Sequence, residues 1–357
     1  MEAVSIPRVL VSVVNSTVNL RIIFMSKIIA EIRYDSFMKK ILWILLPLFF
    51  IGCAQKSPVT WQERIVKHKV ASIPLAYDEY GTENNQTLLF LHGFGESKYT
   101  WRFLIDTLSP KYHLVMLDLK GFGESPKTDD DAYSVYDQAK YVQDFITRQN
   151  LRNVTVVGRS FGGGVALVLA LMQNDGMMEQ RINKMVLINS MSYQQRLPSM
   201  MRYLQMPIVG FVGIHLLSGT WIATEAYKFA FSDDSKIPQE SVDYAAKMME
   251  KPHAKYAYIE TVDLIIPDDI AKMQQRYREI DLPTLILWGR EDVSIRAKLA
   301  HRLHRELRNS QLVIYPNVGH MPQEEVPERV SQAIDDFMQG KKVEYPLPKK
   351  IKRVKKK

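Results

Sequence analysis

The stretch VTVVGRSFGGGVALVLA, from Val154 to Ala170, decides the fold. It begins with β-branched residues typical of a buried strand, passes through the pentapeptide GRSFG, and continues as an apolar run typical of a helix. A glycine-rich turn between a strand and a helix can bind a phosphate or present a serine as a nucleophile. Phosphate binding requires G-x-x-x-x-G-K-[S/T] or G-x-G-x-x-G, and neither pattern occurs here. The stretch therefore favours Ser160 as a nucleophile.

A serine hydroxyl reacts only with the help of a general base and of a carboxylate that orients this base. The strand predicted at residues 284–288 is followed by Glu291 and Asp292, and the strand predicted at 311–315 is followed by His320. The carboxyl ends of parallel strands meet at one edge of a sheet. We therefore expect an acid and a histidine to lie beside Ser160.

Strands and helices alternate along most of the chain, which predicts an α/β fold with a parallel sheet and helices on both faces. The alternation stops between residues 190 and 281, a segment of helical composition that we interpret as a lid. Two strands are expected between residues 61 and 81, and six more at 87–91, 112–117, 154–157, 184–189, 284–288 and 311–315.

Five motifs stand in an order that resembles the α/β-hydrolases across residues 61–340: HGFGES, DLKGFGESPK, GRSFGG, LWGREDV and NVGHMPQEE. The resemblance implies a mostly parallel eight-stranded sheet, with a core of residues 61–189 and 282–340 and a helical lid of residues 190–281. It implies that Ser160 is the nucleophile, His320 the base and Asp292, rather than Glu291, the acid. The backbone N–H groups of Phe94 and Phe161 would form the oxyanion hole.

A serine at this turn argues against the haloalkane dehalogenase and epoxide hydrolase branches of the family, whose nucleophile is an aspartate. The resemblance favours a carboxylesterase or lipase that cleaves an ester with an apolar acyl or alkyl part through a covalent acyl-enzyme on Ser160. One alternative is a C–C bond hydrolase of ring-cleavage products, and another is a catalytically silent ligand-binding lipoprotein. No cofactor is implied. No metal site is expected either, because His301 and His304 have no evident third ligand.

Three features near the motifs leave alternatives open. Arg159 either binds an anionic group of the substrate or points sideways and pairs with an acid of a neighbouring loop. His92 is expected to brace its own loop rather than to react. The apolar lid stretch from Met206 to Gly219 either forms an acyl-binding pocket, dips into a bilayer surface or packs on the sheet domain.

The N-terminal region resembles the signal sequence of a bacterial lipoprotein. From Met38 the chain reads MKKILWILLPLFFIGCAQKS, with an apolar run too short to span a membrane and a lipobox-like end at Cys53, although Phe50 stands where that pattern prefers leucine. We expect residues 1–37 to be an over-extended start or disordered, 38–53 to be the signal peptide, Cys53 to be lipidated and 54–60 to be a tether. This predicts an exported protein on the periplasmic side of a bacterial cell envelope, rather than a cytoplasmic one.

The positive charge of the chain lies in its C-terminal tail. The net charge is +8, and residues 341–357 contain nine Lys or Arg and one Glu, so the rest of the chain is neutral. A neutral body argues against a nucleic-acid partner. We expect the tail to be disordered, and it either solubilises the protein or binds a membrane surface with anionic lipids beside the lipid anchor. The other expected partner is a small, apolar ester substrate.

Overall fold

The structure is a computed structural model that describes residues 56–343 of the 357-residue chain. The predicted segments 1–37 and 38–53, with Cys53, lie outside the described residues, as does the basic tail beyond residue 343. The predictions that concern them are therefore not tested by the structure.

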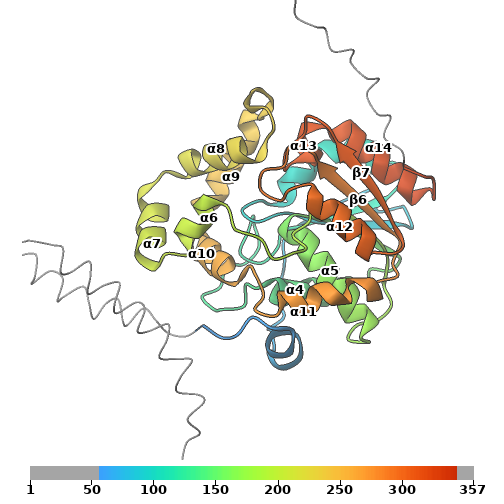
Figure 1. Cartoon of the computed structure of the whole chain (residues 1–357), viewed down its shortest axis with the longest axis horizontal. Helices are drawn as coiled ribbons and strands as arrows, with labels where there is room; N and C mark the ends of the chain where they lie inside the picture. Colours follow the sequence, from blue (N-terminus) through green and yellow to red (C-terminus); the bar gives the residue numbers. More distant parts are fainter. Residues whose placement is uncertain (1–55, 344–357) are drawn as a thin grey trace, which may run out of the picture. The chain divides into compact units, whose positions relative to one another are not determined.

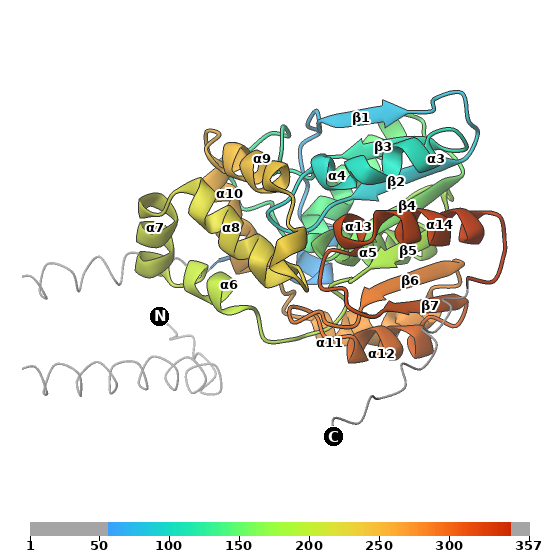
Figure 2. The same ribbon diagram turned by 90° about the horizontal axis from the view of Figure 1, so that it is seen from above.

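One seven-stranded sheet organises the described residues (Figures 1 and 2), in the order β1-β3-β2-β4-β5-β6-β7. Only β1 is antiparallel to its neighbour, β3, and all other pairs are parallel. This confirms the predicted mostly parallel sheet. The strands are β1 (Tyr77–Tyr80), β2 (Thr87–Leu91), β3 (His113–Leu117), β4 (Val154–Arg159), β5 (Ile182–Ile188), β6 (Thr284–Gly289) and β7 (Ser310–Tyr315).

Helices cover both faces of the sheet, because the central strands are apolar on both sides. Leu89 and Leu91 of β2 belong to one core cluster, while Leu88 and Phe90 belong to the other. Residues of α4 (Val135–Arg148), α5 (Phe161–Asn174) and α12 (Lys298–Glu306) pack in the first cluster. Residues of η2 (Lys98–Leu104), α3 (Ile105–Leu108) and α14 (Pro327–Met338) pack in the second.

The described chain has seven strands where eight were expected, because residues 61–81 contain one strand instead of two. Trp61–Lys67 forms a π-type helix, η1. The Thr60 hydroxyl caps it by accepting the Glu63 N–H (3.1 Å), and the Trp61 N–H donates to Asp269 (2.8 Å). Arg64 is buried against the Asp131 carboxylate (3.0 Å). Asp269 and Asp131 lie far away in the sequence, so the local pattern does not reveal the helix.

The chain between β5 and β6 is helical. Pro207 occupies the first turn of α7, and the Ser218 hydroxyl caps α8 by accepting the Trp221 N–H (3.2 Å). The helices are α6 (Ser199–Leu204), α7 (Pro207–Leu216), α8 (Gly219–Ala230), η3 (Asp234–Lys236), α9 (Gln239–Met249), α10 (Ala254–Leu264), α11 (Ile270–Gln275) and η4 (Arg276–Glu279). We call α6 to α10 the lid helices.

Within residues 56–343, no single helix has the length and apolarity needed to cross a membrane. The pair α7 and α8 meets the same criteria only when both are taken together, and they are bent by 109° at their junction.

Candidate active site

Ser160 lies on the tight turn that joins β4 to α5. Its backbone has φ 50° and ψ −115°, a strained conformation for a non-glycine residue, and its N–H donates to the Ile188 carbonyl (3.0 Å). The flanking glycines make room for this turn. A Cβ on Gly158 would lie 2.5 Å from the Gly162 oxygen, and one on Gly162 would lie 2.2 Å from the Leu91 oxygen. The pentapeptide therefore needs glycine at both ends.

The structure brings the three residues from distant parts of the sequence together. The Ser160 Oγ lies 3.1 Å from His320 Nε2, and His320 Nδ1 lies 2.7 Å from Asp292 Oδ2. A carboxylate accepts hydrogen bonds, so Nδ1 carries the ring proton, and Nε2 is left to accept the serine proton. The arrangement is that of a nucleophile, a base and an orienting acid.

Asp292 is held by four hydrogen bonds, whereas Glu291 faces solvent. The Ser294 and Ile295 N–H groups donate to Asp292 Oδ1, both at 2.8 Å. The Asn189 amide donates to Oδ2 (2.5 Å), beside His320. Glu291 is exposed and accepts the Val318 N–H (3.1 Å) instead. Of the two candidate acids, Asp292 contacts the histidine.

Burial and charge fix the ionisation of the pair. Burial alone would raise the pKa of Asp292, but the charge and hydrogen bond of His320 and the amide of Asn189 hold it below its usual value. Burial lowers the pKa of His320, and the charge of Arg159 adds to this effect against the opposing charge of Asp292. The resting pair is therefore an aspartate and a neutral histidine.

The loop that contains Phe94 lies against the serine. A Cβ on Gly93 would come within 3.2 Å of the Ser160 Cβ. Two neighbouring N–H groups already donate hydrogen bonds within the protein. The Gly162 N–H donates to the His92 carbonyl (3.1 Å), and the Gly163 N–H donates to the Ser160 carbonyl (3.0 Å). Among the described residues, we find no acceptor for the N–H groups of Phe94 and Phe161. These two groups are available for an oxygen of a bound substrate.

Arg159 points sideways and pairs with an acid of a neighbouring loop. Its guanidinium forms an ion pair with Glu96 and donates to the His320 carbonyl (2.9 Å), and the residue is buried. His92 braces its loop: Nδ1 donates to the Gly93 carbonyl (2.7 Å) and Nε2 accepts the Leu119 N–H (3.0 Å). Burial lowers the pKa of His92 to about 4, which keeps the ring neutral. Both residues support the loops of the site.

Comparison with known proteins identifies the family. The model of the alpha/beta hydrolase fold matches residues 86–327, which contain all the residues of this site. The chain belongs to the α/β-hydrolase fold family.

Three relatives of this α/β-hydrolase show the range of the similarity. An uncharacterized hydrolase of Bacillus subtilis, YugF, is 28% identical over 77% of this chain and 97% of its own length. The 2-hydroxy-6-oxo-6-(2'-aminophenyl)hexa-2,4-dienoic acid hydrolase of Metapseudomonas resinovorans is 24% identical over 80% and 93%. The crystal structure of a putative lipase from Acinetobacter baumannii is 28% identical, has a TM-score of 0.62 and covers 80% of this chain and 98% of that one.

The lid helices of this hydrolase contact both halves of the site. The Tyr258 hydroxyl of α10 donates to the Gly95 carbonyl (3.0 Å), and its ring packs on Phe94. At the end of α8, the Ala230 carbonyl accepts the N–H of His320 itself (2.6 Å). The position of the lid therefore fixes the loop beside the serine and the loop that contains the base.

A buried carboxylate joins the lid to the sheet domain nearby. Glu324 accepts hydrogen bonds from Thr100 (2.8 Å) on η2 and Ser241 (2.7 Å) on α9. Arg102 lies 3.6 Å away from Glu324 and also donates to Ser241 (2.7 Å). Burial raises the pKa of Glu324, against the charge of Arg102. This cluster holds α9 in place over the site.

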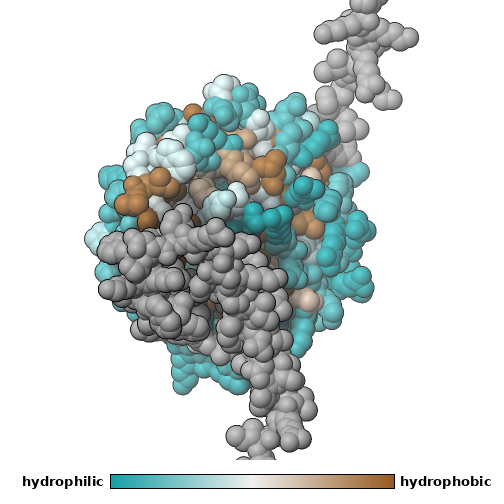
Figure 3. Space-filling model, turned by 60° about the vertical axis from the view of Figure 1, so that its left-hand side comes forward, coloured by the Kyte–Doolittle hydropathy of each residue, from teal (hydrophilic) through white to brown (hydrophobic). Residues whose placement is uncertain are grey.

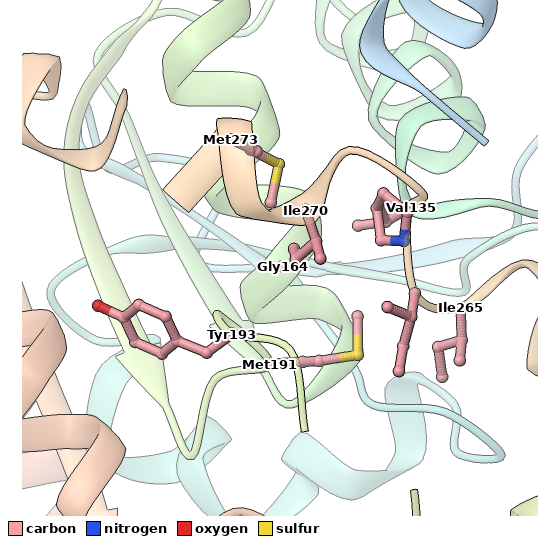
Figure 4. A pocket seen from close by; sticks show the side chains of 9 residues that line it. Val135, Gly164, Met191, Tyr193, Ile265, Ile270 and Met273 are labelled. Atoms are coloured by element: carbon pink, nitrogen blue, oxygen red, sulfur yellow. The ribbon is translucent and has the colours of Figure 1, made fainter. Parts of the chain in front are cut away.

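A small apolar cavity lies beside the start of α5 (Figure 4). Gly164, one turn after the serine, contributes to its wall, and so does Met191, whose N–H donates to the Ser160 carbonyl (2.9 Å). The cavity has a volume of about 10 Å³, enough for a water-sized particle. Four side chains of the 265–273 segment line it: Ile265, Ile266, Ile270 and Met273.

No group of three or more His, Cys, Asp or Glu side chains within residues 56–343 is placed to hold a metal ion. The residues that the sequence motifs did not assign are Asn189, which holds Asp292, and Tyr258 and Glu324, which tie the lid to the site. Asn189 follows β5 and Asp292 follows β6, so both lie at the carboxyl ends of neighbouring strands. This shared position is the sequence signal from which their contact could have been predicted.

Proposed function

We propose that this α/β-hydrolase is a serine hydrolase that cleaves carboxylic esters through a covalent acyl-enzyme on Ser160. The observation that carries this proposal is the continuous hydrogen-bonded series from the Ser160 Oγ through His320 to Asp292, at 3.1 and 2.7 Å. Its position beside the N–H groups of Phe94 and Phe161 supports the same conclusion.

The reaction follows from these positions. The Ser160 Oγ attacks the carbonyl carbon while His320 Nε2 takes the hydroxyl proton, and Asp292 stabilises the resulting imidazolium. The N–H groups of Phe94 and Phe161 bind the oxyanion. The imidazolium then protonates the leaving alkoxide as the C–O bond breaks. Water repeats the sequence on the acyl-enzyme and releases the acid and the free serine.

An apolar acyl or alkyl part is the substrate feature that fits the surroundings of the serine. The small cavity beside the start of α5, one turn after the serine, is walled by Met191, isoleucines and Met273. Arg159, the residue before the serine, is already paired with Glu96 and does not offer its charge to a substrate. The structural relative described as a putative lipase agrees with this preference.

Hydrolysis of a C–C bond is the second candidate, and the relative named as a dienoic acid hydrolase favours it. The two candidates differ in their substrates. A panel of p-nitrophenyl esters of increasing chain length, assayed beside a ring-fission dienoate, separates them. Turnover of the dienoate without turnover of any ester would overturn the ester proposal.

Covalent labelling tests the nucleophile directly. A fluorophosphonate probe should label the wild-type chain on Ser160 and should not label Ser160→Ala. Equal labelling of both proteins, or no labelling of either, would contradict the mechanism. If the chain binds an ester equally well with and without the Ser160 hydroxyl and never turns it over, it is a catalytically silent binding protein.

We further propose that the protein is exported and anchored to the cell envelope through a lipid on Cys53, with the basic tail against anionic lipids. The support is the sequence alone: the apolar run after Met38, the Gly-Cys-Ala end and nine Lys or Arg in residues 341–357. Palmitate labelling should disappear in Cys53→Ser, and the mature mass should begin at residue 53. A product that retains Met1 would contradict the proposal.

A further inference from the structure

The lid carries an unusual surface that the reaction does not use. Its outer part exposes large apolar side chains, among them Phe211 at 58%, Leu216 at 79% and Trp221 at 50% of their full area. Figure 3 turns the lid side forward and shows hydrophobic surface there in brown. We define the α7 surface by six of these residues: Met206, Ile208, Phe211, Leu216, Leu217 and Trp221.

Helix α7 is apolar towards solvent as well as towards the protein. Only Gly210 and Ile214 of this helix are buried. At about 100° per residue, the exposed positions 208, 209, 211, 212 and 216 spread over an arc of about 160° on the other side. A surface helix of a globular protein normally places polar residues on that side. The α7 surface therefore does not pack on the sheet domain, and it does not line the cavity beside Ser160.

The composition of this region is that of a segment at a lipid interface. No Asp, Glu, Lys or Arg occurs from Tyr203 to Thr224, a run that includes the aromatic residues Tyr203 and Trp221. Tyrosine and tryptophan favour the level of the lipid headgroups. Two exposed basic residues, Arg196 and Arg202, precede the run and suit contact with phosphates.

The first described residues contact the segment that follows the lid helix α10. The Val59 N–H donates to Asp268 (3.1 Å), just after α10. The α6–α7 junction lies at the end of the same helix, where Gln205 donates to the Val262 carbonyl (3.1 Å). Residues 262 and 268 are at most about 20 Å apart.

We propose that the α7 surface docks on a lipid bilayer, with its apolar side chains inserted at the interface. Burying exposed Leu and Phe side chains supplies the free energy, so the binding requires no particular headgroup. A lipid on Cys53 would keep the protein at the bilayer. Only that last step rests on the anchoring proposal, and none of the steps rests on the reaction at Ser160.

A local probe tests the proposal in the full chain. Cys53 is the one cysteine of the sequence, so Cys53→Ser with Leu216→Cys gives a single attachment site for an environment-sensitive fluorophore. On addition of phosphatidylcholine vesicles, we expect a blue shift and a several-fold rise in emission. The matched control, Cys53→Ser with Met177→Cys, should not respond, because Met177 lies between α5 and β5, outside the lid. An unchanged signal at position 216, or equal signals at both positions, overturns the proposal.

Charge substitutions in the same labelled chain show what drives the contact. Ile208→Asp with Phe211→Asp should raise the lipid concentration needed for half of the response at least about tenfold, whereas Met177→Asp should not change it. The response should persist at high salt and with phosphatidylcholine alone, which separates it from attraction of the basic tail to phosphatidylglycerol vesicles. A response that follows protein concentration without vesicles identifies a second copy as the partner and overturns the proposal.

Discussion

Helices α5 and α7 are both strongly apolar, yet they have opposite surroundings. Every residue of α5 from Phe161 to Gln173 is buried, whereas only two of the ten residues of α7 are. The difference arises from their place in the fold. Helix α5 follows β4 in the middle of the sheet, and its glycines allow close packing: a Cβ on Gly163 would lie 2.4 Å from the Ser190 Oγ. Helix α7 extends from the lid and packs on the described residues through only one side, where a Cβ on Gly210 would lie 2.2 Å from the Leu204 oxygen.

The comparison shows that apolarity alone says which helix needs an apolar environment but not what provides it. The interior of the protein surrounds α5, and this helix holds Ser160 at its first turn. For α7, the apolar environment that we propose is the lipid bilayer, which lies outside the described fold. Substitutions in the two helices, and in the contacts that tie the lid to the site, should therefore have very different effects.

The largest effect should come from the site at the start of α5. Asp292→Asn should reduce kcat/KM for a soluble short-chain ester about 10⁴-fold, because the amide favours the wrong tautomer of His320. Steady-state kinetics with an unchanged Tm would show that the loss is chemical. Leu216→Ala on α7 is the matched control and should stay within about twofold. A decrease of less than tenfold in Asp292→Asn would contradict the assignment of the acid.

The second effect is on stability. Leu167→Ala in α5 removes a fully buried side chain and should lower the free energy of unfolding by about 2–5 kcal/mol. The same change at Leu216, which is 79% exposed, should alter it by less than about 0.5 kcal/mol. Urea unfolding of the two variants beside the wild type measures both. Similar losses would mean that α7 is buried in the protein in solution.

The elements around α5 could be predicted well from the sequence, because their pattern is local. The strand expected at 87–91 matches β2, and the helix-like apolar run after the pentapeptide lies in α5, Phe161–Asn174. The order of Ser160, Asp292 and His320 at strand ends predicted that they meet. Buried parallel strands produce continuous apolar runs, and the turns after them contain the polar residues of the site.

The features of the fold and of the site that the sequence did not predict depend on contacts between distant residues. The helix Trp61–Lys67 replaces an expected strand because Asp269 and Asp131 hold its first turns. Whether Arg159 faces the substrate or a loop is decided by Glu96. The lid stretch from Met206 left three interpretations open, since composition is the same for a helix that is buried and for one that is exposed.

The third prediction concerns the hydroxyl of Tyr258, which joins α10 to the loop beside the serine. Tyr258→Phe removes one hydrogen bond to Gly95 and retains the ring packing on Phe94. A loss of about 1 kcal/mol in positioning the oxyanion donor corresponds to an about fivefold lower kcat, with KM little changed. Unchanged kcat would show that the loop is positioned without this bond. The hydroxyl of Tyr203, exposed on the outer lid, provides the matched Tyr→Phe control.

The smallest expected effect is a shift in the pH dependence of kcat/KM. It arises in the buried site and not in the exposed part of the lid. His320 must be neutral to take the serine proton, so activity is present above its pKa and is lost as the pH falls through it. Burial and the charge of Arg159 lower this pKa from the ordinary value of about 6.5. The acid limb of kcat/KM should therefore lie below pH 6.5.

Substitution of Arg159 tests the electrostatic part of this shift. Arg159→Gln removes a positive charge near His320 and leaves Glu96 without its partner, and both changes stabilise the imidazolium. The acid limb should move to higher pH. Arg159→Lys retains the charge and should leave the limb near its wild-type position. A limb that does not move in Arg159→Gln would mean that burial alone sets the pKa of His320, and that the ion pair with Glu96 serves only to hold the two loops together.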